Sequence, residues 1–222
     1  RAAIQCKVKK VIALSTDKAA SPVNLYGATK LCSDKLFVAG NAMSGDAQTR
    51  FAVVRYGNVV GSRGSVIPFF LKCRDRGDVL TITDKRMTRF SITLQQGVDF
   101  VLNNFERMFG GEVFVPKIPS YRILDVAKAV APDAEIKFIG IRPGEKLHEL
   151  MVPEDEARHT IEFDDYMIIQ PDFPWWNVSK HLEESGGKPC PEGFSYRSDS
   201  NDEWLSVEQL QETICEYERR GE

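Results

Sequence analysis

A tyrosine and a lysine stand four residues apart at Tyr26 and Lys30, within the string Tyr-Gly-Ala-Thr-Lys. On a helix, residues at positions i and i+4 share a face. A cation beside a phenol favours the phenolate, so the tyrosine pKa falls from its usual value of about 10. A tyrosine of this kind can take a proton from a sugar or alcohol hydroxyl near neutral pH. Taken alone, the same spacing also arises by chance on a solvated helix.

A second chemically loaded segment is the polar turn Thr16-Asp17-Lys18, which lies about ten residues before Tyr26. It follows residues 8–14, a run rich in Val, Ile and Leu that predicts a buried strand. A carboxylate and an ammonium that share protons titrate as a unit, so the sequence alone does not divide acid and base roles between Asp17 and Lys18. The competing interpretation of this pair is a solvated turn.

The elements that must position these residues alternate along the first hundred residues. The predicted strands are 8–14, 51–60, 79–83, 112–115 and 136–141, with a strand or hairpin at 160–170. The predicted helices are 24–42, 66–74, 92–109, 121–130, 145–151 and 205–217. Such alternation predicts an α/β fold with a mostly parallel sheet. Ligands bind outside the carboxyl ends of the strands in such sheets, where the turns at 16–18 and 57–65 both lie.

Composition excludes several classes of protein. The chain has 222 residues, 42% of them hydrophobic and 27% charged, which is typical of a soluble chain with a core. A net charge of −3 argues against a general nucleic-acid binder. The sequence contains no apolar run of the roughly 18 residues that a membrane span needs. Five cysteines without a C-x-x-C motif indicate a reducing cytoplasm, and three widely spaced histidines predict no metal site.

The longer string Ser-Thr-Asp-Lys-Ala-Ala-Ser-Pro-Val-Asn-Leu-Tyr-Gly-Ala-Thr-Lys at 15–30 resembles a known family. It is similar to the inverting UDP-N-acetylglucosamine 4,6-dehydratases, from the extended branch of the short-chain dehydrogenase/reductase superfamily. Segments 55–70, 87–98 and 142–151 extend the resemblance over about residues 1–170. The resemblance implies the first step of pseudaminic acid synthesis, for glycosylation of flagellin or of the cell surface.

The resemblance also implies a fold and a domain plan. The fold is α/β, with the C-terminal part of a Rossmann-like doubly wound parallel sheet and a smaller α/β substrate-binding subdomain. Residues 1–62 would carry the C-terminal half of an NADP-binding domain, with the catalytic Tyr and Lys. Residues 63–170 would form mainly a substrate-binding region interleaved with Rossmann elements, and residues 171–222 a loop-rich tail with a closing helix.

The chemistry of the family explains why these residue types are needed. Hydride leaves C4 of the sugar, the resulting 4-keto group acidifies the C5 hydrogen, water is lost across C5 and C6, and hydride returns to C6. The resemblance implies that Tyr26, with Lys30, handles the C4 hydroxyl proton, while Thr16 hydrogen-bonds the C4 oxygen. Lys30 would also hold the nicotinamide ribose. For the elimination, we favour Lys18 as the base at C5 and Asp17 as the acid at C6.

Further residues carry over from the family as ligand contacts. Tyr26, Lys30 and Val59 would bind the cofactor, and the sugar nucleotide would be bound by Thr16, Asn58, Thr81, Arg89, Arg142 and Glu145. The two arginines are the candidates for the diphosphate, because a guanidinium binds phosphate oxygens in pairs. Each residue also has an ordinary structural interpretation: Asn58 as a turn former, the arginines as surface ion pairs and Glu145 as an acid at a helix start.

The resemblance implies NADP as cofactor, with NAD as the alternative, UDP-N-acetylglucosamine as substrate and a homo-oligomer. The glycine-rich fingerprint that seats the cofactor pyrophosphate is absent from the chain. By the layout of the family, roughly 100 upstream residues would be missing, about one βαβαβ half of the sheet. We therefore expect the chain alone to bind NADP weakly and to turn over no substrate.

Two other functions fit the same residues. A UDP-sugar 4-epimerase of this fold would use Tyr26 and Lys30 but would leave the Asp17–Lys18 pair without a role. A non-catalytic dinucleotide-sensing module would keep the site as a binding pocket. The complete acid–base set argues against a sensor, because a sensor needs no base for C5.

Overall fold

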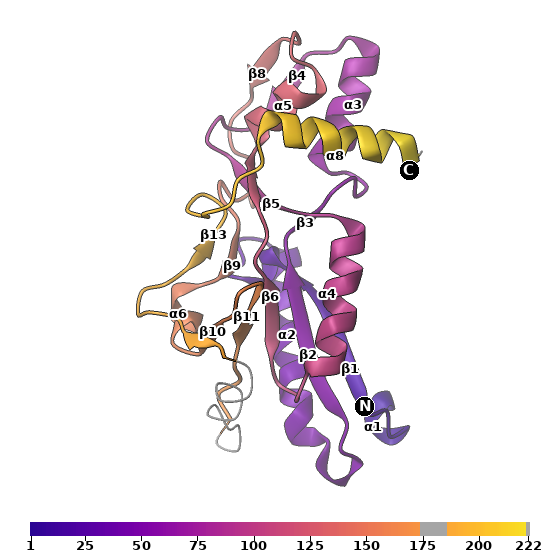
Figure 1. Cartoon of the computed structure of the whole chain (residues 1–222), viewed down its shortest axis with the longest axis vertical. Helices are drawn as coiled ribbons and strands as arrows, with labels where there is room; N and C mark the ends of the chain where they lie inside the picture. The colour runs from indigo at the N-terminus through magenta and orange to yellow at the C-terminus, as the bar shows by residue number, and fades with distance from the viewer. Residues whose placement is uncertain (174–185, 221–222) are drawn as a thin grey trace. The chain divides into compact units, whose positions relative to one another are not determined.

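The computed structural model describes residues 1–173 and 186–220, and Figure 1 shows their course along the chain. The chain divides into two compact units. The first unit comprises residues 1–56, 95–117 and 150–196, and the second unit comprises residues 57–94, 118–149 and 197–222. Positions 174–185 of the predicted tail, with the last two residues, lie outside the described residues. The cofactor and substrate roles assigned to segments 1–62 and 63–170 stay predictions.

A six-stranded sheet with the order β1-β2-β6-β11-β10-β12 forms the centre of the first unit. Its strands are β1 (Lys10–Thr16), β2 (Arg50–Tyr56), β6 (Val113–Pro116), β10 (Thr160–Glu162), β11 (Tyr166–Ile169) and β12 (Lys188–Pro189). The strands β1, β2 and β6 pair in parallel, whereas β11, β10 and β12 extend the sheet by antiparallel pairs. The predicted parallel sheet is therefore confirmed for β1, β2 and β6, and the predicted hairpin is β10 with β11.

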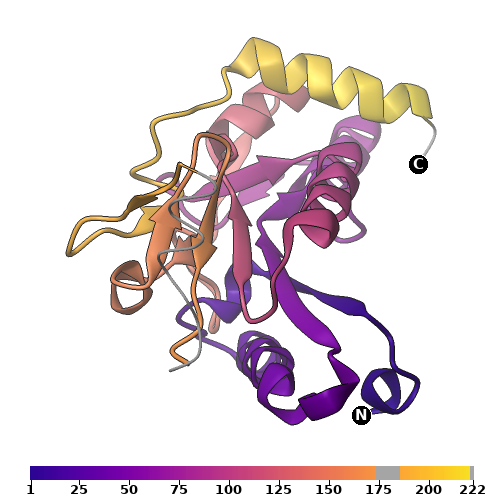
Figure 2. The same cartoon turned by 60° about the horizontal axis from the view of Figure 1, so that its bottom comes forward.

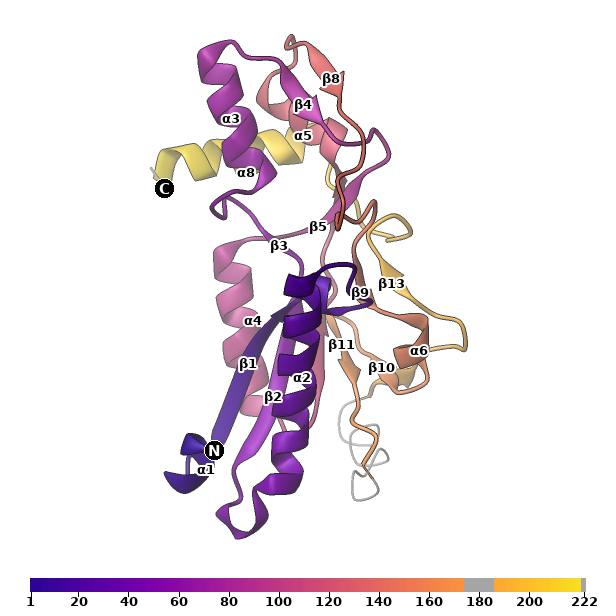
Figure 3. The same cartoon turned by 180° about the vertical axis from the view of Figure 1, so that it is seen from behind.

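Helices cover both faces of the parallel strands, as their continuous apolar sequence requires. The helical elements of the first unit are α1 (Ala2–Gln5), η1 (Asp17–Ala19), α2 (Leu25–Met43), η2 (Gly45–Ala47), α4 (Leu94–Arg107) and α6 (Glu154–Ala157). Figures 1 and 3 show α2 and α4 on opposite faces of β2. Phe37 of α2 meets Phe51 with ring centroids 6.1 Å apart, while Phe100 of α4 packs on the cluster that contains Val54. This alternation of helices around parallel strands is the predicted Rossmann-like arrangement.

The described residues of the second unit form two small sheets and three helices. Its strands are β3 (Asn58–Val59), β4 (Leu80–Ile82), β5 (Thr88–Ile92), β7 (Ser120–Arg122) and β8 (Ile136–Phe138), and its helices are α3 (Val66–Arg76), α5 (Ile123–Val130) and α8 (Val207–Arg220). The sheets have the orders β3-β5-β7 and β4-β8. Leu210 and Ile214 of α8 belong to the same buried core as Val126 of α5, and Figure 2 shows α8 against α5.

The remaining strands among the described residues are β9 (Leu150–Val152) and β13 (Tyr196–Arg197).

Two predictions about local helices need correction. The helix predicted at 145–151 is wrong: the chain there has no helical turn before β9, and the carbonyls of Lys146 and Leu147 accept hydrogen bonds from Arg89 instead. The helix predicted at 92–109 begins at Leu94, because β5 occupies residues up to Ile92.

No helix among residues 1–173 and 186–220 has both the length and the apolar character needed to cross a bilayer. The other predicted helices are confirmed as α2, α3, α5 and α8, with ends that differ by a few residues.

The core of the first unit makes one stability prediction. Phe114 of β6 is fully buried, so Phe114→Ala leaves a cavity and should lower the free energy of unfolding by about 3–5 kcal/mol. Phe105 of α4 is 40% exposed and serves as a matched control, for which we expect a loss below about 1 kcal/mol. Urea unfolding followed by circular dichroism measures both variants, and equal losses would contradict this assignment of the core.

Candidate active site

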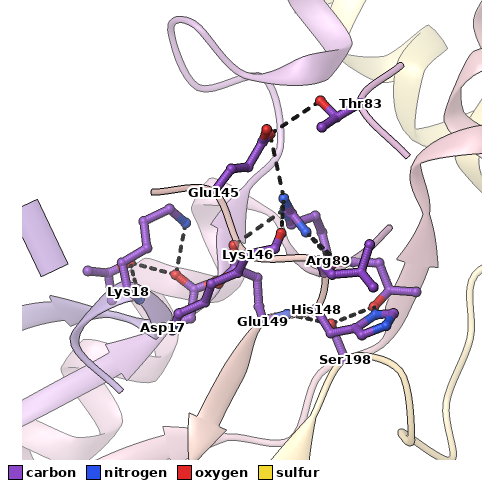
Figure 4. A network of polar contacts seen from close by, with 12 residues as sticks. Asp17, Lys18, Thr83, Arg89, Glu145, Lys146, His148, Glu149 and Ser198 are labelled. Carbon is purple, nitrogen blue, oxygen red and sulfur yellow. Dashed lines mark hydrogen bonds and ion pairs between the residues drawn. The ribbon is translucent and has the colours of Figure 1, made fainter. Parts of the chain in front are cut away.

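The turn after β1 joins a hydroxyl, a carboxylate and an ammonium. Thr16 ends β1, and Asp17 and Lys18 begin η1. The Thr16 hydroxyl donates to Asp17 Oδ1 at 2.7 Å, and Lys18 Nζ donates to the same oxygen at 3.0 Å (Figure 4). The Asp17 side chain is fully buried, whereas that of Lys18 is 34% exposed. One carboxylate oxygen thus receives two proton donors, an arrangement in which protons can be exchanged.

The predicted tyrosine and lysine lie in the first two turns of α2. Asn24 begins this helix, and its side-chain oxygen accepts a hydrogen bond from Gly27 N at 2.8 Å. Tyr26 is 56% exposed. Lys30 Nζ donates to the carbonyl oxygen of Leu14 in β1 at 2.7 Å. The lysine is therefore held at the carboxyl end of β1, and the predicted helical placement of both residues is confirmed.

A buried charge cluster lies behind this turn, formed by Arg55, Asp34 and Glu156. The Arg55 side chain is 1% exposed, and its guanidinium lies 3.4 Å from Asp34 Oδ2 and 2.9 Å from Glu156 Oε2. It also donates to the carbonyl oxygen of Met151 at 2.8 Å. The Ser15 hydroxyl donates to Asp34 Oδ2 at 2.8 Å. The cluster therefore connects β1, β2, α2, β9 and α6 within the first unit.

The two carboxyl groups of this cluster respond to it in opposite ways. Burial raises the pKa of Asp34, and the hydrogen bond from Ser15 and the charge of Arg55 only partly offset that rise. Burial also acts to raise the pKa of Glu156, but the charges and hydrogen bonds of Arg55 and Lys35 outweigh it and hold this pKa below its usual value. Arg55 and Lys35 together thus favour the charged form of Glu156.

Sequence reasoning missed this cluster, although the sequence contains a signal for it. Arg55 interrupts the apolar run of residues 51–54, in a strand whose residues are almost all buried. A charged residue in such a strand requires buried partners of opposite charge. One of them, Asp34, follows Lys30 by four residues on the same helix. Nothing in the spacing of Glu156 could have identified it as the second partner.

In the second unit, Asn58 and Val59 form β3, which pairs in parallel with β5. The side-chain oxygen of Asn58 is buried and finds no hydrogen-bond partner among the described residues. A buried amide oxygen without a partner is costly, so it is a suitable acceptor for a ligand donor. The interpretation of Asn58 as a contact of the sugar nucleotide stays a prediction, and this geometry favours it.

Arg89 of β5 is mostly buried, and its polar atoms have partners within the second unit. Its side chain is 10% exposed, and its Nε lies 3.4 Å from a carboxylate oxygen of Glu149. Its terminal nitrogens donate to the carbonyl oxygens of Thr88 and Leu147 at 2.7 and 3.1 Å. They also donate to the carbonyl oxygen of Lys146 at 3.1 Å (Figure 4). Arg89 thus fastens the segment 145–149 to β5. Its predicted role on the diphosphate stays untested.

The remaining predicted ligands of the second unit lie on or near β4 and β8. Thr81 is the middle residue of β4, and Arg142 is exposed in the loop that follows β8. Glu145 lies 4.0 Å from Arg89, with its other oxygen 3.4 Å from the backbone nitrogen of Arg142. The structure therefore brings Arg89, Arg142 and Glu145 into one neighbourhood of the second unit.

A second polar network of this unit also escaped sequence reasoning. The Thr88 hydroxyl lies 2.8 Å from His148 Nδ1 and 2.7 Å from the hydroxyl of Ser198, which is fully buried. The Ser198 hydroxyl accepts a hydrogen bond from Glu149 N at 2.9 Å. Burial lowers the pKa of His148, against the opposing effect of Asp199. The network fixes segment 148–149, and no spacing in the sequence links Thr88 to Ser198.

The first unit offers polar groups suited to the ribose of the predicted nicotinamide cofactor. An exposed phenol and an ammonium lie on consecutive turns of α2, and the bond to Leu14 uses one of the three donors of Lys30. Two donors are left for the hydroxyls of a ribose. For a metal ion, the described part of the chain contains no group of three or more His, Cys, Asp or Glu side chains that could hold one.

The chain is similar to a known family and to several known proteins. The family described as polysaccharide biosynthesis protein matches residues 1–171. A UDP-N-acetylglucosamine 4,6-dehydratase (inverting) of Campylobacter jejuni is 57% identical over 212 residues, which are 93% of this chain and 64% of that relative. A UDP-glucose 4-epimerase of Rickettsia conorii is 42% identical over 96% of this chain and 63% of its own length.

A solved structure, Pen from Bacillus thuringiensis, superposes on 98% of this chain with a TM-score of 0.85 and 34% identity. The match covers 65% of that structure. The chain thus spans 64% of the length of the Campylobacter relative and 63% of the Rickettsia relative.

The buried cluster predicts a specific response to loss of its cation. Arg55→Met leaves the buried Asp34 without its cation and leaves Glu156 with Lys35 as its remaining partner, which should lower the free energy of unfolding by about 3–5 kcal/mol at pH 7. Without the guanidinium, burial raises the pKa of Asp34 further in the folded state. The folded state then binds protons more readily than the unfolded chain, so the penalty should shrink as the pH falls through this raised value.

Urea unfolding at pH 7 and pH 5 measures the effect. Arg86→Met is the control, because Arg86 is 63% exposed and pairs with Asp84 at the surface, so its loss should cost less than about 1 kcal/mol. A penalty for Arg55→Met that is small, or that grows toward acid pH, would contradict the assigned charges.

Proposed function

We propose that this chain, which belongs to the polysaccharide biosynthesis protein family, carries the acid–base residues of an inverting UDP-N-acetylglucosamine 4,6-dehydratase. The observation that carries the proposal is the bonded set Thr16, Asp17 and Lys18 at the end of β1, in the same unit as Tyr26 and Lys30. The 57% identity to the Campylobacter jejuni dehydratase supports it.

At C4 of the sugar, Tyr26 would take the hydroxyl proton, and the neighbouring Lys30 ammonium would stabilise the phenolate. Thr16 would donate a hydrogen bond to the C4 oxygen when its hydroxyl turns from Asp17. A bound nicotinamide dinucleotide, for which we propose NADP, would supply the redox chemistry: it accepts hydride from C4 and returns it to C6. Lys30 would orient its ribose, and Val59 would contact its nicotinamide end.

The Asp17–Lys18 pair can supply both groups that the elimination needs. Transfer of one proton from Lys18 to Asp17 converts the ion pair into a neutral amine and a carboxylic acid. The amine then takes the C5 proton, and the acid gives its proton to the C6 hydroxyl, which leaves as water. Lys18 ends as an ammonium and Asp17 as a carboxylate, so the original pair is restored. When hydride returns to C6, C5 would take a proton from Lys18, which would recover a proton from solvent. The 3.0 Å contact between the two side chains allows the transfer from Lys18 to Asp17.

For the sugar nucleotide, we propose contacts from Asn58, Thr81, Arg142 and Glu145. The exposed Arg142 is the better diphosphate ligand, and Arg89 contributes chiefly by holding the segment that contains Glu145. We further propose a homo-oligomer that works in the cytoplasm and feeds pseudaminic acid synthesis. The second candidate is a 4-epimerase, which the 42% identity to the Rickettsia conorii protein favours.

The first experiment compares two proteins. One is the chain alone, for which we expect weak NADP binding and no turnover. The other is a chimera in which the chain replaces the matching 64% of the Campylobacter jejuni relative. Each is incubated with UDP-N-acetylglucosamine and NADP⁺ in D₂O. For the chimera we expect loss of one water, deuterium at C5 and a 6-methyl proton signal with inverted C5. An unchanged mass with a new C4 epimer would instead establish the epimerase.

A substitution separates the two candidates further. Asp17→Asn removes the proposed acid, so dehydration by the chimera should fall by a factor of about 10²–10⁴ while oxidation at C4 continues. Reduced nicotinamide should then accumulate, which its absorbance measures. Asp75→Asn, at an exposed aspartate of α3, is the control and should leave both steps unchanged. An Asp17→Asn chimera that interconverts C4 epimers at the parent rate would rule out the dehydratase role.

A further inference from the structure

The start of α2 lies unusually close to η1, and a glycine makes this contact possible. A side-chain carbon at Gly27 would overlap with the carbonyl oxygen of Lys18 and would lie 2.9 Å from Cβ of Pro22. Gly27 is buried and has ordinary helical geometry, so its backbone conformation alone does not require glycine. Glycine is needed at this position because a side chain would block the close approach of η1 to α2.

We infer that Gly27 is a positioning residue that sets the distance between the two acid–base sets of the proposed dehydratase. Tyr26 and Lys30 flank Gly27 and move with α2. Asp17 and Lys18 move with η1, whose main-chain carbonyl touches the position of the missing Cβ. The inference rests on the proposed function, because only a reaction with both oxidation and elimination needs the two sets at one sugar.

A Cβ at position 27 would meet main-chain atoms of Lys18, and such a clash is hard to relieve. A side chain can rotate away from an added methyl group, but the carbonyl of Lys18 can move only if the turn moves. The hydrogen bonds from Lys30 Nζ to Leu14 O and from the Ser15 hydroxyl to Asp34 Oδ2 tie α2 to β1. An added methyl group should therefore displace η1 rather than the helix.

The same helix offers a matched control. Gly40 is also a buried glycine of α2, and a Cβ there would meet the ring of Phe51 at 3.1 Å. This contact is tight but involves a side chain far from η1. Gly27→Ala and Gly40→Ala raise helix propensity equally. They differ in which neighbour must yield and in how far it must move, because the contact at Gly40 is longer than those at Gly27.

Hydrogen exchange tests the positioning in the chain itself, without any need for turnover. The relevant amides are Lys18 N, bonded to Thr16 Oγ1, and Ala20 N, bonded to the carbonyl of Asp17. We expect Gly27→Ala to speed exchange at these two amides by at least about tenfold, as expected for local opening of a turn, and Gly40→Ala to leave them unchanged. Unchanged exchange in a folded Gly27→Ala chain would overturn the inference.

Activity of the chimera provides a measurement that a purely structural role of Gly27 would leave unchanged. Gly27→Ala should slow dehydration at least about tenfold relative to oxidation at C4, a ratio that corresponds to displacement of one reacting group. Reduced nicotinamide should accumulate, and Gly40→Ala should show the parent ratio of the two steps. Equal loss of both steps, or loss of neither, would overturn the inference.

Two further outcomes of these experiments also bear on the inference. If the parent chimera forms no product, the proposed function fails, and the exchange data still decide whether Gly27 holds the turn. If Gly27→Ala does not fold by circular dichroism, the double variant Pro22→Gly/Gly27→Ala removes the second contact and is measured instead. A parent ratio of the two steps in a folded double variant would overturn the inference, and a reduced ratio would support it.

Discussion

The packing of the first unit depends on one buried cation, which requires carboxylate and carbonyl partners. The guanidinium of Arg55 lies inside the unit, and its contacts reach Asp34 in α2, Glu156 in α6 and the carbonyl oxygen of Met151 in β9. A buried charge is tolerated only where such partners surround it. The hydrogen bond from Arg55 to the carbonyl oxygen of Met151 therefore holds the segment around residue 151 beside β2, which lies about a hundred residues earlier in the chain.

The same cluster determines how the helix meets the first strand. Asp34 accepts a hydrogen bond from the Ser15 hydroxyl, and Lys30, one turn earlier on α2, donates to the carbonyl oxygen of Leu14. Two consecutive residues of β1 are thus tied to two consecutive turns of α2. The next residue along β1 is Thr16, where the proposed chemistry begins. The position of the reactive turn is a consequence of these ties and of the close approach at Gly27.

Much of this could be predicted from the sequence, because the relevant patterns are local. The apolar runs of β1 and β2, the capped start of α2 and the Tyr26–Lys30 spacing each involve only near neighbours along the chain. β5 was missed because all five of its residues are buried, two of them with hydroxyl side chains, so that polarity does not alternate along it. The helix expected at 145–151 fails because Arg89 binds the carbonyls that a helix would use.

The parts that could not be predicted are those in which distant residues satisfy one another. Glu156 pairs with Arg55 across a separation of 101 residues, and Thr88 meets Ser198 across 110 residues. Periodicity and motif spacing carry no information about such pairs. The crowding at Gly27 is likewise invisible in a sequence, since it arises from a carbonyl oxygen that every residue type possesses.

The division of the chain into two units has a consequence for folding and for engineering. Each unit is assembled from three separate segments, so the chain passes from one unit to the other five times. The segments of each unit come together only after most of the given residues have been synthesised, and contacts between distant segments slow folding. For the same reason, no single cut releases an intact unit. Recombination between relatives would have to exchange both units together, so the proposed reaction centre and the nucleotide contacts would be inherited as one piece.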